Sequence, residues 1–161
     1  MSAPGTVAAH GLRVASLRGW DVRIFRRPPD PPETTHAVLH AATFALPADV
    51  GDYGDGAVQV MGAGDVFVAM VEFAAASAEQ ALFAGRGIPG PLRSADFSRA
   101  SLQVSRPGQA GVQRWFGEAG RAWCLYVVVG SWEGRAALAR RANALVEAIE
   151  VAAATTGATG Q

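Results

Sequence analysis

Two stretches of this chain are apolar at nearly every position, and each has the length of a strand. Residues 66–73 (VFVAMVEF) contain a single charged side chain, Glu72, and residues 122–129 (AWCLYVVV) contain none. A strand with one face in water alternates apolar and polar residues, whereas a strand covered on both faces has no such alternation. We therefore expect both stretches to be central strands of a sheet with a layer on each side.

Shorter runs predict further strands around these two. They are residues 12–15, 20–25, 36–46, 57–61, 101–104 and 112–116. The run 36–46 fits a strand or a helix, and we favour a strand because turn-forming residues flank it. The Gly62-Ala-Gly64 segment predicts a hairpin that joins a strand at 57–61 to the apolar stretch after it. Residues 101–104 fit an edge strand.

Helical spacing is clearest near the end of the chain. Within residues 135–149, the apolar side chains of Leu138, Ala142, Leu145 and Ile149 recur every three or four positions, after a plausible N-cap at Ser131. A capping-box pattern at Ser77–Gln80 predicts a shorter helix that extends to residue 83.

These elements predict the α+β class: an antiparallel sheet of about six to eight strands with a C-terminal helix packed on one face. Residues 1–151 form a single domain in this interpretation, and residues 152–161 form a flexible tail. One long helix covers only one face of the sheet. Either residues 77–98 cover the second face or another protein does.

Charge and composition exclude several functions. Fourteen basic and fourteen acidic residues cancel among 161 residues, which argues against a nucleic-acid binder. All the basic residues are arginine, so chemistry that needs a lysine is excluded. The start of the chain lacks the pattern of a signal peptide, and no apolar run is long enough to span a membrane. A single cysteine fits a reducing compartment, and we expect a cytoplasmic protein.

No set of residues predicts catalysis, a cofactor or a metal site. His36 and His40 would face one way on a helix but lie about 13 Å apart in a strand, too far for one metal ion. Cys124 lies in the middle of a strand and is expected to be buried and inert. Glu72 is expected to pair with an arginine on a neighbouring strand, either Arg114 or Arg121.

Five residues are candidates for an interface. Trp115 lies near a turn and Trp132 at the start of the long helix, where either ring could be partly exposed. Arg23, Arg26 and Arg27 form a small basic cluster beside a run of prolines.

Two segments carry a resemblance to a known fold family. Leu12–Trp20 (LRVASLRGW) leads from one short strand into another, and Gly120–Gly130 (GRAWCLYVVVG) is followed by the helix and then by Ala148–Val151 (AIEV). This order resembles the PsbP-like α+β family, whose usual proline before Gly-Trp is replaced by Arg18 here. The chain also resembles uncharacterised actinobacterial proteins. The resemblance implies a small antiparallel domain that binds other proteins, with no catalytic residues to carry over.

The sequence therefore predicts a non-catalytic protein-interaction or assembly domain, whose partner is another protein or a second copy of itself. The alternative is a small-molecule binding protein with an apolar pocket between the sheet and the helix. No cofactor is expected in either case.

Overall fold

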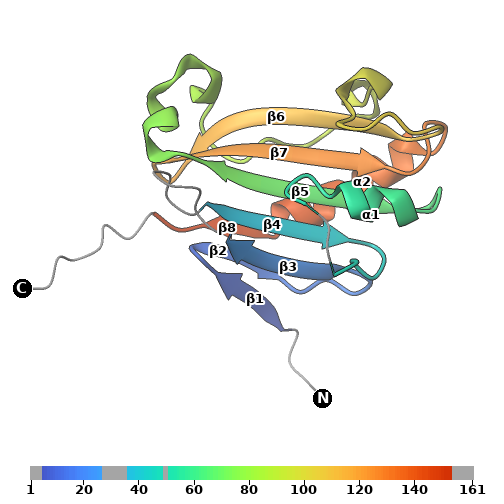
Figure 1. Ribbon diagram of the computed structural model, residues 1–161, viewed down its shortest axis with the longest axis horizontal. Coiled ribbons are helices and arrows are strands. Elements are labelled where there is room, and N and C mark those ends of the chain that lie inside the picture. Colours follow the sequence, from blue (N-terminus) through green and yellow to red (C-terminus); the bar gives the residue numbers. More distant parts are fainter. Residues whose placement is uncertain (1–4, 27–35, 49–50, 154–161) are drawn as a thin grey trace, which may run out of the picture.

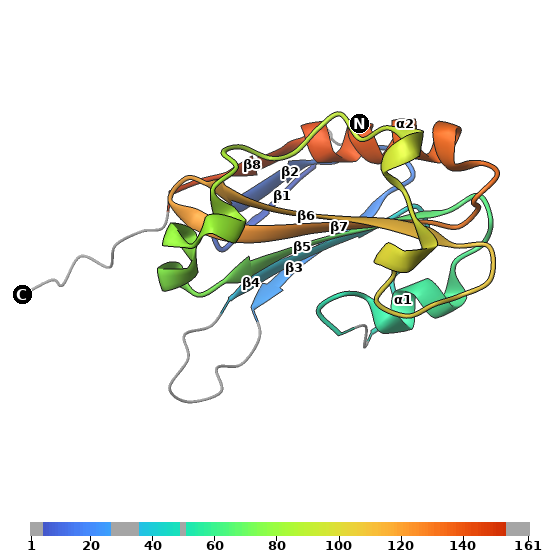
Figure 2. The ribbon, with the colours of Figure 1, turned by 90° about the horizontal axis from the view of Figure 1, so that it is seen from above.

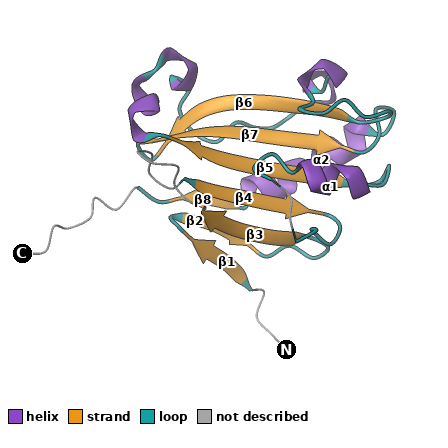
Figure 3. Ribbon diagram, in the orientation of Figure 1, coloured by secondary structure: helices purple, strands orange, loops and turns teal. Residues whose placement is uncertain are grey.

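The computed structural model describes residues 5–26, 36–48 and 51–153. In this part the chain forms two antiparallel sheets and a C-terminal helix, which confirms the predicted α+β class (Figures 1 and 3). The strands are β1 (Thr6–Ala9), β2 (Leu12–Ala15), β3 (Asp21–Arg26), β4 (Ala37–Ala42), β5 (Val66–Phe73), β6 (Ala110–Glu118), β7 (Arg121–Val129) and β8 (Ile149–Val151). The helices are α1 (Asp55–Val60), α2 (Arg135–Glu147) and the short 3₁₀ helices η1 (Ala75–Glu79), η2 (Ala81–Phe83), η3 (Ser94–Asp96) and η4 (Arg99–Ser101).

The elements form three layers (Figure 2). The larger sheet, with the strand order β3-β4-β5-β7-β6, is the middle layer. One outer layer consists of α2 and the small sheet β1-β2-β8, and α1 lies on the opposite side of the larger sheet. We call the side of α2 the helix face and the side of α1 the second face.

The two apolar stretches are β5 and β7, and both lie inside the larger sheet as predicted. Every residue of β7 and the first six residues of β5 are buried. Their alternate side chains divide between two cores. Met70 and Leu125 belong to the larger core under α2, whereas Phe67 and Tyr126 belong to a smaller core on the second face. The lack of alternation in the sequence therefore reflects a strand pair with a packed layer on each side.

The chain covers most of the second face itself. Ala57 and Val58 of α1, together with Leu46 from the segment before it, close the smaller core over Phe67 and Tyr126. Farther along the same face, the ring of Phe83 in η2 packs on that of Phe73, with centroids 5.3 Å apart. Of the two alternatives from the sequence, residues 77–98 contribute part of the cover through Phe83, and a segment before β5, which the sequence did not indicate, contributes most of it.

The prediction of a strand at residues 57–61 is wrong, because α1 occupies this segment. Gly54, Ala57 and Val58 are the buried positions, and this spacing of three and four residues is that of a helix face. The main-chain N–H of Val58 donates to the carbonyl of Gly54 at 2.9 Å. The hairpin expected through Gly62-Ala-Gly64 is instead a turn from helix to strand.

Three other boundaries differ from the predictions. Residues 101–104 do not form an edge strand; η4 ends at Ser101, and residues 103–104 form a bend. Residues 75–83 form two 3₁₀ helices in which no side chain caps the first turn. The long helix ends at Glu147 because residues 149–151 form β8, which pairs with β2. The hydroxyl of Ser131 accepts from the N–H of Gly134 at 3.1 Å and so closes the turn before α2 rather than capping the helix itself.

Candidate functional site

The interface candidates from the sequence do not lie together. Trp115 is on β6 and Arg23 and Arg26 are on β3, which are the two opposite edges of the larger sheet. Trp132 lies in the turn before α2. Arg27 falls outside the described residues.

The guanidinium of Arg23 is bound within the chain. It donates to the carbonyl oxygens of Leu46 at 2.6 Å and Pro47 at 2.8 Å, and it lies 3.5 Å from the carboxylate of Asp21. These bonds fasten the segment after β4 to the sheet edge. Arg26 is exposed at the end of β3.

Trp115 is the candidate with the clearest exposed surface. Its side chain is on the second face and 36% exposed. On the same face of β6, Leu102 crosses over Gly111, and the carbonyl of Phe83 lies over Gly117. Two exposed aliphatic residues belong to these crossing segments: Val104, 43% exposed, and Leu82, 56% exposed. Trp115 therefore lies along the strand between two segments that each carry an exposed apolar side chain.

The position of Val104 is set by a bond to the sheet. The N–H of Gln103 donates to the hydroxyl of Tyr126 at 2.9 Å, and Tyr126 lies directly opposite Gln113 in the β6–β7 pair. On the other side, η2 contacts β6. We call Leu82, Val104, Gln113 and Trp115 the Trp115 surface.

The outer edge of β6 is closed at both ends and open between them. The N–H of Gly111 donates to the carbonyl of Ser98 at 3.0 Å, and the N–H of Gly117 donates to that of Gly85 at 2.7 Å. By the alternation of a strand, the N–H groups of Gln113 and Trp115 point to the same edge. Neither has an acceptor on that edge within the described residues. Two unpaired main-chain N–H groups therefore lie beside the exposed indole, whereas the carbonyl of Gln113 accepts from Nη1 of Arg114 at 3.0 Å.

The polar side chain of His40 on the second face is buried and holds the segment around Asp52 to the sheet. His40 lies between the rings of Phe25 and Phe67, with centroid distances of 5.1 and 5.2 Å, and its Nε2–H donates to the carbonyl of Asp52 at 2.7 Å. Burial lowers the pKa of His40 below its usual value. The imidazole is therefore neutral, with its Nδ1 buried and unbonded in the described structure.

Cys124 is buried as predicted, and burial raises the pKa of its thiol to about 11. His40 cannot serve it as a base. His40 is in register with Ala69 and Tyr126, whereas Cys124 is in register with Val71, so the two side chains lie two strands apart and two residues out of line. Neighbouring strands are about 4.8 Å apart, which makes their lateral separation about 10 Å. The arrangement does not form a thiolate–imidazole pair.

Glu72 pairs with Arg121, one of the two partners expected from the sequence. Two guanidinium nitrogens of Arg121 bind the two carboxylate oxygens at 2.6 and 2.9 Å. The other predicted partner, Arg114, lies 3.3 Å from Asp96 instead. Arg121 also donates to the carbonyls of His10 and Ala152 at 3.0 and 3.3 Å. The ion pair lies within the larger sheet, and the two bonds to main-chain carbonyls connect Arg121 to the small sheet.

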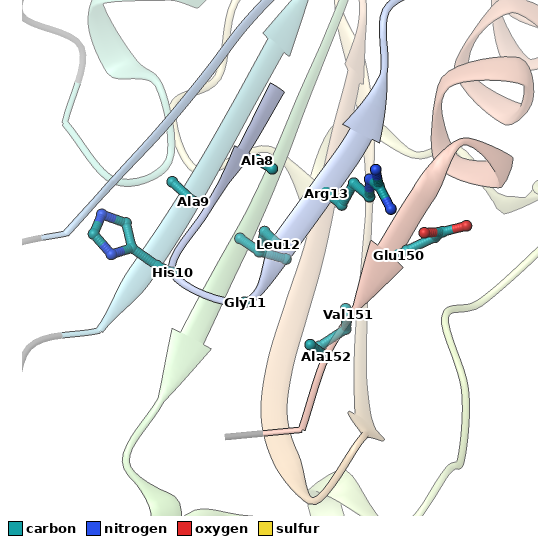
Figure 4. Close-up of a pocket in the computed structure, with 9 residues that line it drawn as sticks. All are labelled: Ala8, Ala9, His10, Gly11, Leu12, Arg13, Glu150, Val151 and Ala152. Carbon is teal, nitrogen blue, oxygen red and sulfur yellow. The ribbon is translucent and has the colours of Figure 1, made fainter. Parts of the chain in front are cut away.

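A shallow cavity of about 550 Å³ lies over the small sheet (Figure 4). His10, Arg13 and Glu150 are the polar side chains that line it, and His10 points away from the other two. Arg13 and Glu150 are opposite one another in the β2–β8 pair. The described residues contain no cluster of three metal-ligating side chains, here or elsewhere.

No family model, no curated protein and no solved structure matches this chain. The resemblance to the PsbP-like family therefore stays a prediction, and the site is argued from its own geometry. Of the helices that the structure describes, none has the length and apolar character needed to cross a bilayer.

Sequence reasoning named Trp115 but missed its surroundings. Leu82 lies in a short apolar run and Val104 in a predicted edge strand, and neither pattern indicates that the two side chains are exposed on either side of Trp115. A strand edge that is open only between two closures depends on Ser98 and Gly85, which reach β6 through loops. These contacts are tertiary, so no local signal in the sequence indicates them.

Proposed function

We propose that this chain is a non-catalytic protein-interaction domain that binds an extended segment of a partner protein along the middle of β6. The observation that carries the proposal is the Trp115 surface: an exposed indole between two exposed aliphatic side chains, beside two main-chain N–H groups without acceptors in the described structure.

The chemistry of the surface selects an extended peptide. A strand added to a sheet edge takes its affinity from main-chain hydrogen bonds and its specificity from side-chain contacts. Gln113 and Trp115 would supply the two donors, and an apolar partner side chain would lie on the indole. Tryptophan is among the residues that contribute most to the binding energy of interfaces.

The open stretch of β6 is short, because Ser98 and Gly85 close the edge on either side. We therefore expect a small interface, in the size range of transient complexes below about 1,200 Å². Reversible contact with a partner fits this size better than a permanent assembly.

The proposal is for a non-catalytic domain because the side chains that could react are buried, far apart or paired. The thiol of Cys124 is buried, His40 is two strands away from it, and the Glu72 carboxylate is taken up by Arg121. A cytoplasmic partner remains the expectation from the single unpaired cysteine.

The test is affinity purification from the cells that make the protein, with three forms of the chain. The double variant Trp115→Ser/Leu82→Ser removes the apolar side chains of the surface. Val60→Ser is the matched control, since Val60 is an equally apolar residue, 60% exposed, on α1. We expect the wild type and Val60→Ser to recover the same protein, and the double variant to recover at least tenfold less.

Equal recovery by all three forms would contradict the proposal, and so would the lack of any enriched protein. Sedimentation of the purified chain distinguishes the nature of the partner. If the partner is a second copy, the wild type associates with itself and the double variant is a monomer.

A further inference from the structure

A second feature, away from the Trp115 surface, is the stack of arginines on Trp132. The Cζ atom of Arg135 lies 3.9 Å from the centroid of the indole, and that of Arg99 lies 5.7 Å from it. Arg135 is held firmly, because its Nη1 also donates to the carbonyl of Trp132 at 2.8 Å. Arg99 comes from η4, a segment distant in sequence, and it is exposed.

This stack borders a cavity of about 400 Å³. Its walls are three turns, around residues 61–63, 107–109 and 130–133, and both Arg99 and Trp132 line it. The turns are fastened to each other by main-chain bonds, from Trp132 N–H to the Gly108 carbonyl at 2.7 Å and from Gly130 N–H to the Asp65 carbonyl at 2.9 Å. The cavity therefore has rigid walls rather than free loops.

The polar groups of the cavity are incompletely satisfied. No carboxylate of the described chain lies within ion-pair distance of Arg99 or Arg135. Gln109, which also lines the cavity, is only 6% exposed and donates from Nε2 to the Val58 carbonyl at 2.9 Å, while its Oε1 has no partner in the described structure. Buried polar atoms without partners are uncommon in folded proteins. Because Oε1 is an acceptor, a water molecule or a hydroxyl group of a ligand would satisfy it, and an anionic oxygen would not.

From these observations we propose that the cavity binds a small organic oxyanion, a carboxylate or a phosphate ester, through the guanidinium of Arg99. A guanidinium stacked on an aromatic ring keeps its in-plane N–H donors free, and their fork matches the two oxygens of either group. Met61, Ala63 and Pro107 give the cavity apolar walls for the body of the ligand. Its volume lies at the lower end of the range for small-molecule sites.

Glu133 lines the same cavity, and its negative charge limits how much negative charge a bound ligand can carry. With Arg99 and Arg135 on the indole and one carboxylate nearby, the site carries a small positive excess. We therefore infer a ligand with one compact anionic group rather than a polyphosphate. The hydroxyl of Ser131, which accepts from Gly134, keeps its own proton to donate to such a group.

The test is isothermal titration calorimetry of the full chain with lactate and with glycerol phosphate as probes. We expect saturable binding of at least one probe, with a Kd below about 1 mM. Arg99→Gln should weaken it at least tenfold, and Arg99→Lys should restore little because an ammonium lacks the planar fork. Arg140→Gln, an exposed arginine on α2 outside the cavity, is the matched control and should bind as the wild type does.

The two probes distinguish the anion, since a carboxylate site binds lactate and a phosphate site binds glycerol phosphate. No heat with either probe would overturn the proposal. Equal weakening by Arg99→Gln and Arg140→Gln would also overturn it, because it would indicate a general charge effect. Circular dichroism of each variant checks that the fold is intact.

Discussion

At the residue scale, several polar side chains make short hydrogen bonds to main-chain groups of segments distant in the sequence. The amide of Asn143 on α2 binds both the N–H and the carbonyl of Leu92, at 2.7 and 2.9 Å. Arg23 holds the segment after β4 in the same way. Trp115 and Arg99 differ from these residues. The Trp115 side chain is 36% exposed, and Arg99 forms no ion pair within the described part of the chain.

His40 makes the stability of the fold depend on pH. Its folded-state pKa is lowered by burial, so the native state binds fewer protons than the unfolded state, whose imidazole has a pKa of about 6.5. Stability therefore rises with pH in this range: the contribution of neutral His40 is complete above about pH 6.5 and declines as the pH falls below that value toward the folded pKa.

We expect the free energy of unfolding in urea to decrease between about pH 7.5 and pH 5.5, and His40→Gln to reduce that decrease. His36→Gln is the control, because His36 lies just before β4 and is only partly buried. An unchanged pH dependence in His40→Gln would contradict this account of the imidazole.

The Glu72–Arg121 pair belongs to the same scale, and Arg121 also binds the small sheet through the carbonyls of His10 and Ala152. Arg121→Met would remove the only cation paired with the mostly buried Glu72 carboxylate in the described structure, leaving it the N–H of Ala37 at 3.2 Å, and would remove the Arg121 donor from the carbonyl of His10. Breaking a buried ion pair by removing one partner costs about 3–5 kcal/mol, so we expect a loss of that size in chemical denaturation.

Arg114→Met is the matched comparison for Arg121→Met. It removes the pair with Asp96, whose two side chains are half-exposed, and exposed pairs contribute less than about 1 kcal/mol. Similar losses for the two variants would show that Arg121 has no special role in joining the sheets.

At the scale of elements, the central strands could be predicted and the short elements could not. β5 and β7 are eight and nine residues long and apolar except for Glu72 and Arg121, so their place inside the sheet follows from hydrophobicity. α1 has six residues, and its buried pair Ala57 and Val58 fits a strand pattern as well as a helical one until the contact with Phe67 is known. Short apolar runs are ambiguous in this way because a few residues do not define a period.

The turn before β5 and the residue that follows β7 are in close contact. A methyl group on Gly130 would overlap the carbonyl oxygen of Gly62 in the turn before β5. We expect Gly130→Ala to destabilise the fold by about 1–3 kcal/mol, the usual cost of overpacking.

Gly64→Ala in the same turn is the control for Gly130→Ala, because a methyl group there meets no atom within 4 Å. Thermal unfolding should separate the two variants. A Gly130→Ala protein as stable as Gly64→Ala would mean that the turn moves away without cost.

At the scale of the whole molecule, the chain's own segments cover both faces of its two apolar central strands. Two strands that are apolar on both faces need two covering layers, and the chain provides α2 with the small sheet on one face and α1 with its preceding segment on the other. The area left for a partner is correspondingly smaller than the sequence predicts. Leu82, Val104 and Trp115 expose apolar surface at the margin of the sheet around β6, while Val60 exposes a separate side chain on α1.

The most direct measurement of this account is amide hydrogen exchange along β6, first on the protein alone and then with the partner recovered by affinity purification. For the free protein we predict slow exchange at Gly111 and Gly117, whose N–H groups are bonded, and fast exchange at Gln113 and Trp115 between them. With the partner bound, Gln113 and Trp115 should become slow as well. Protection of these two amides in the free protein, or their continued fast exchange in the complex, would contradict an edge that is open for an added strand.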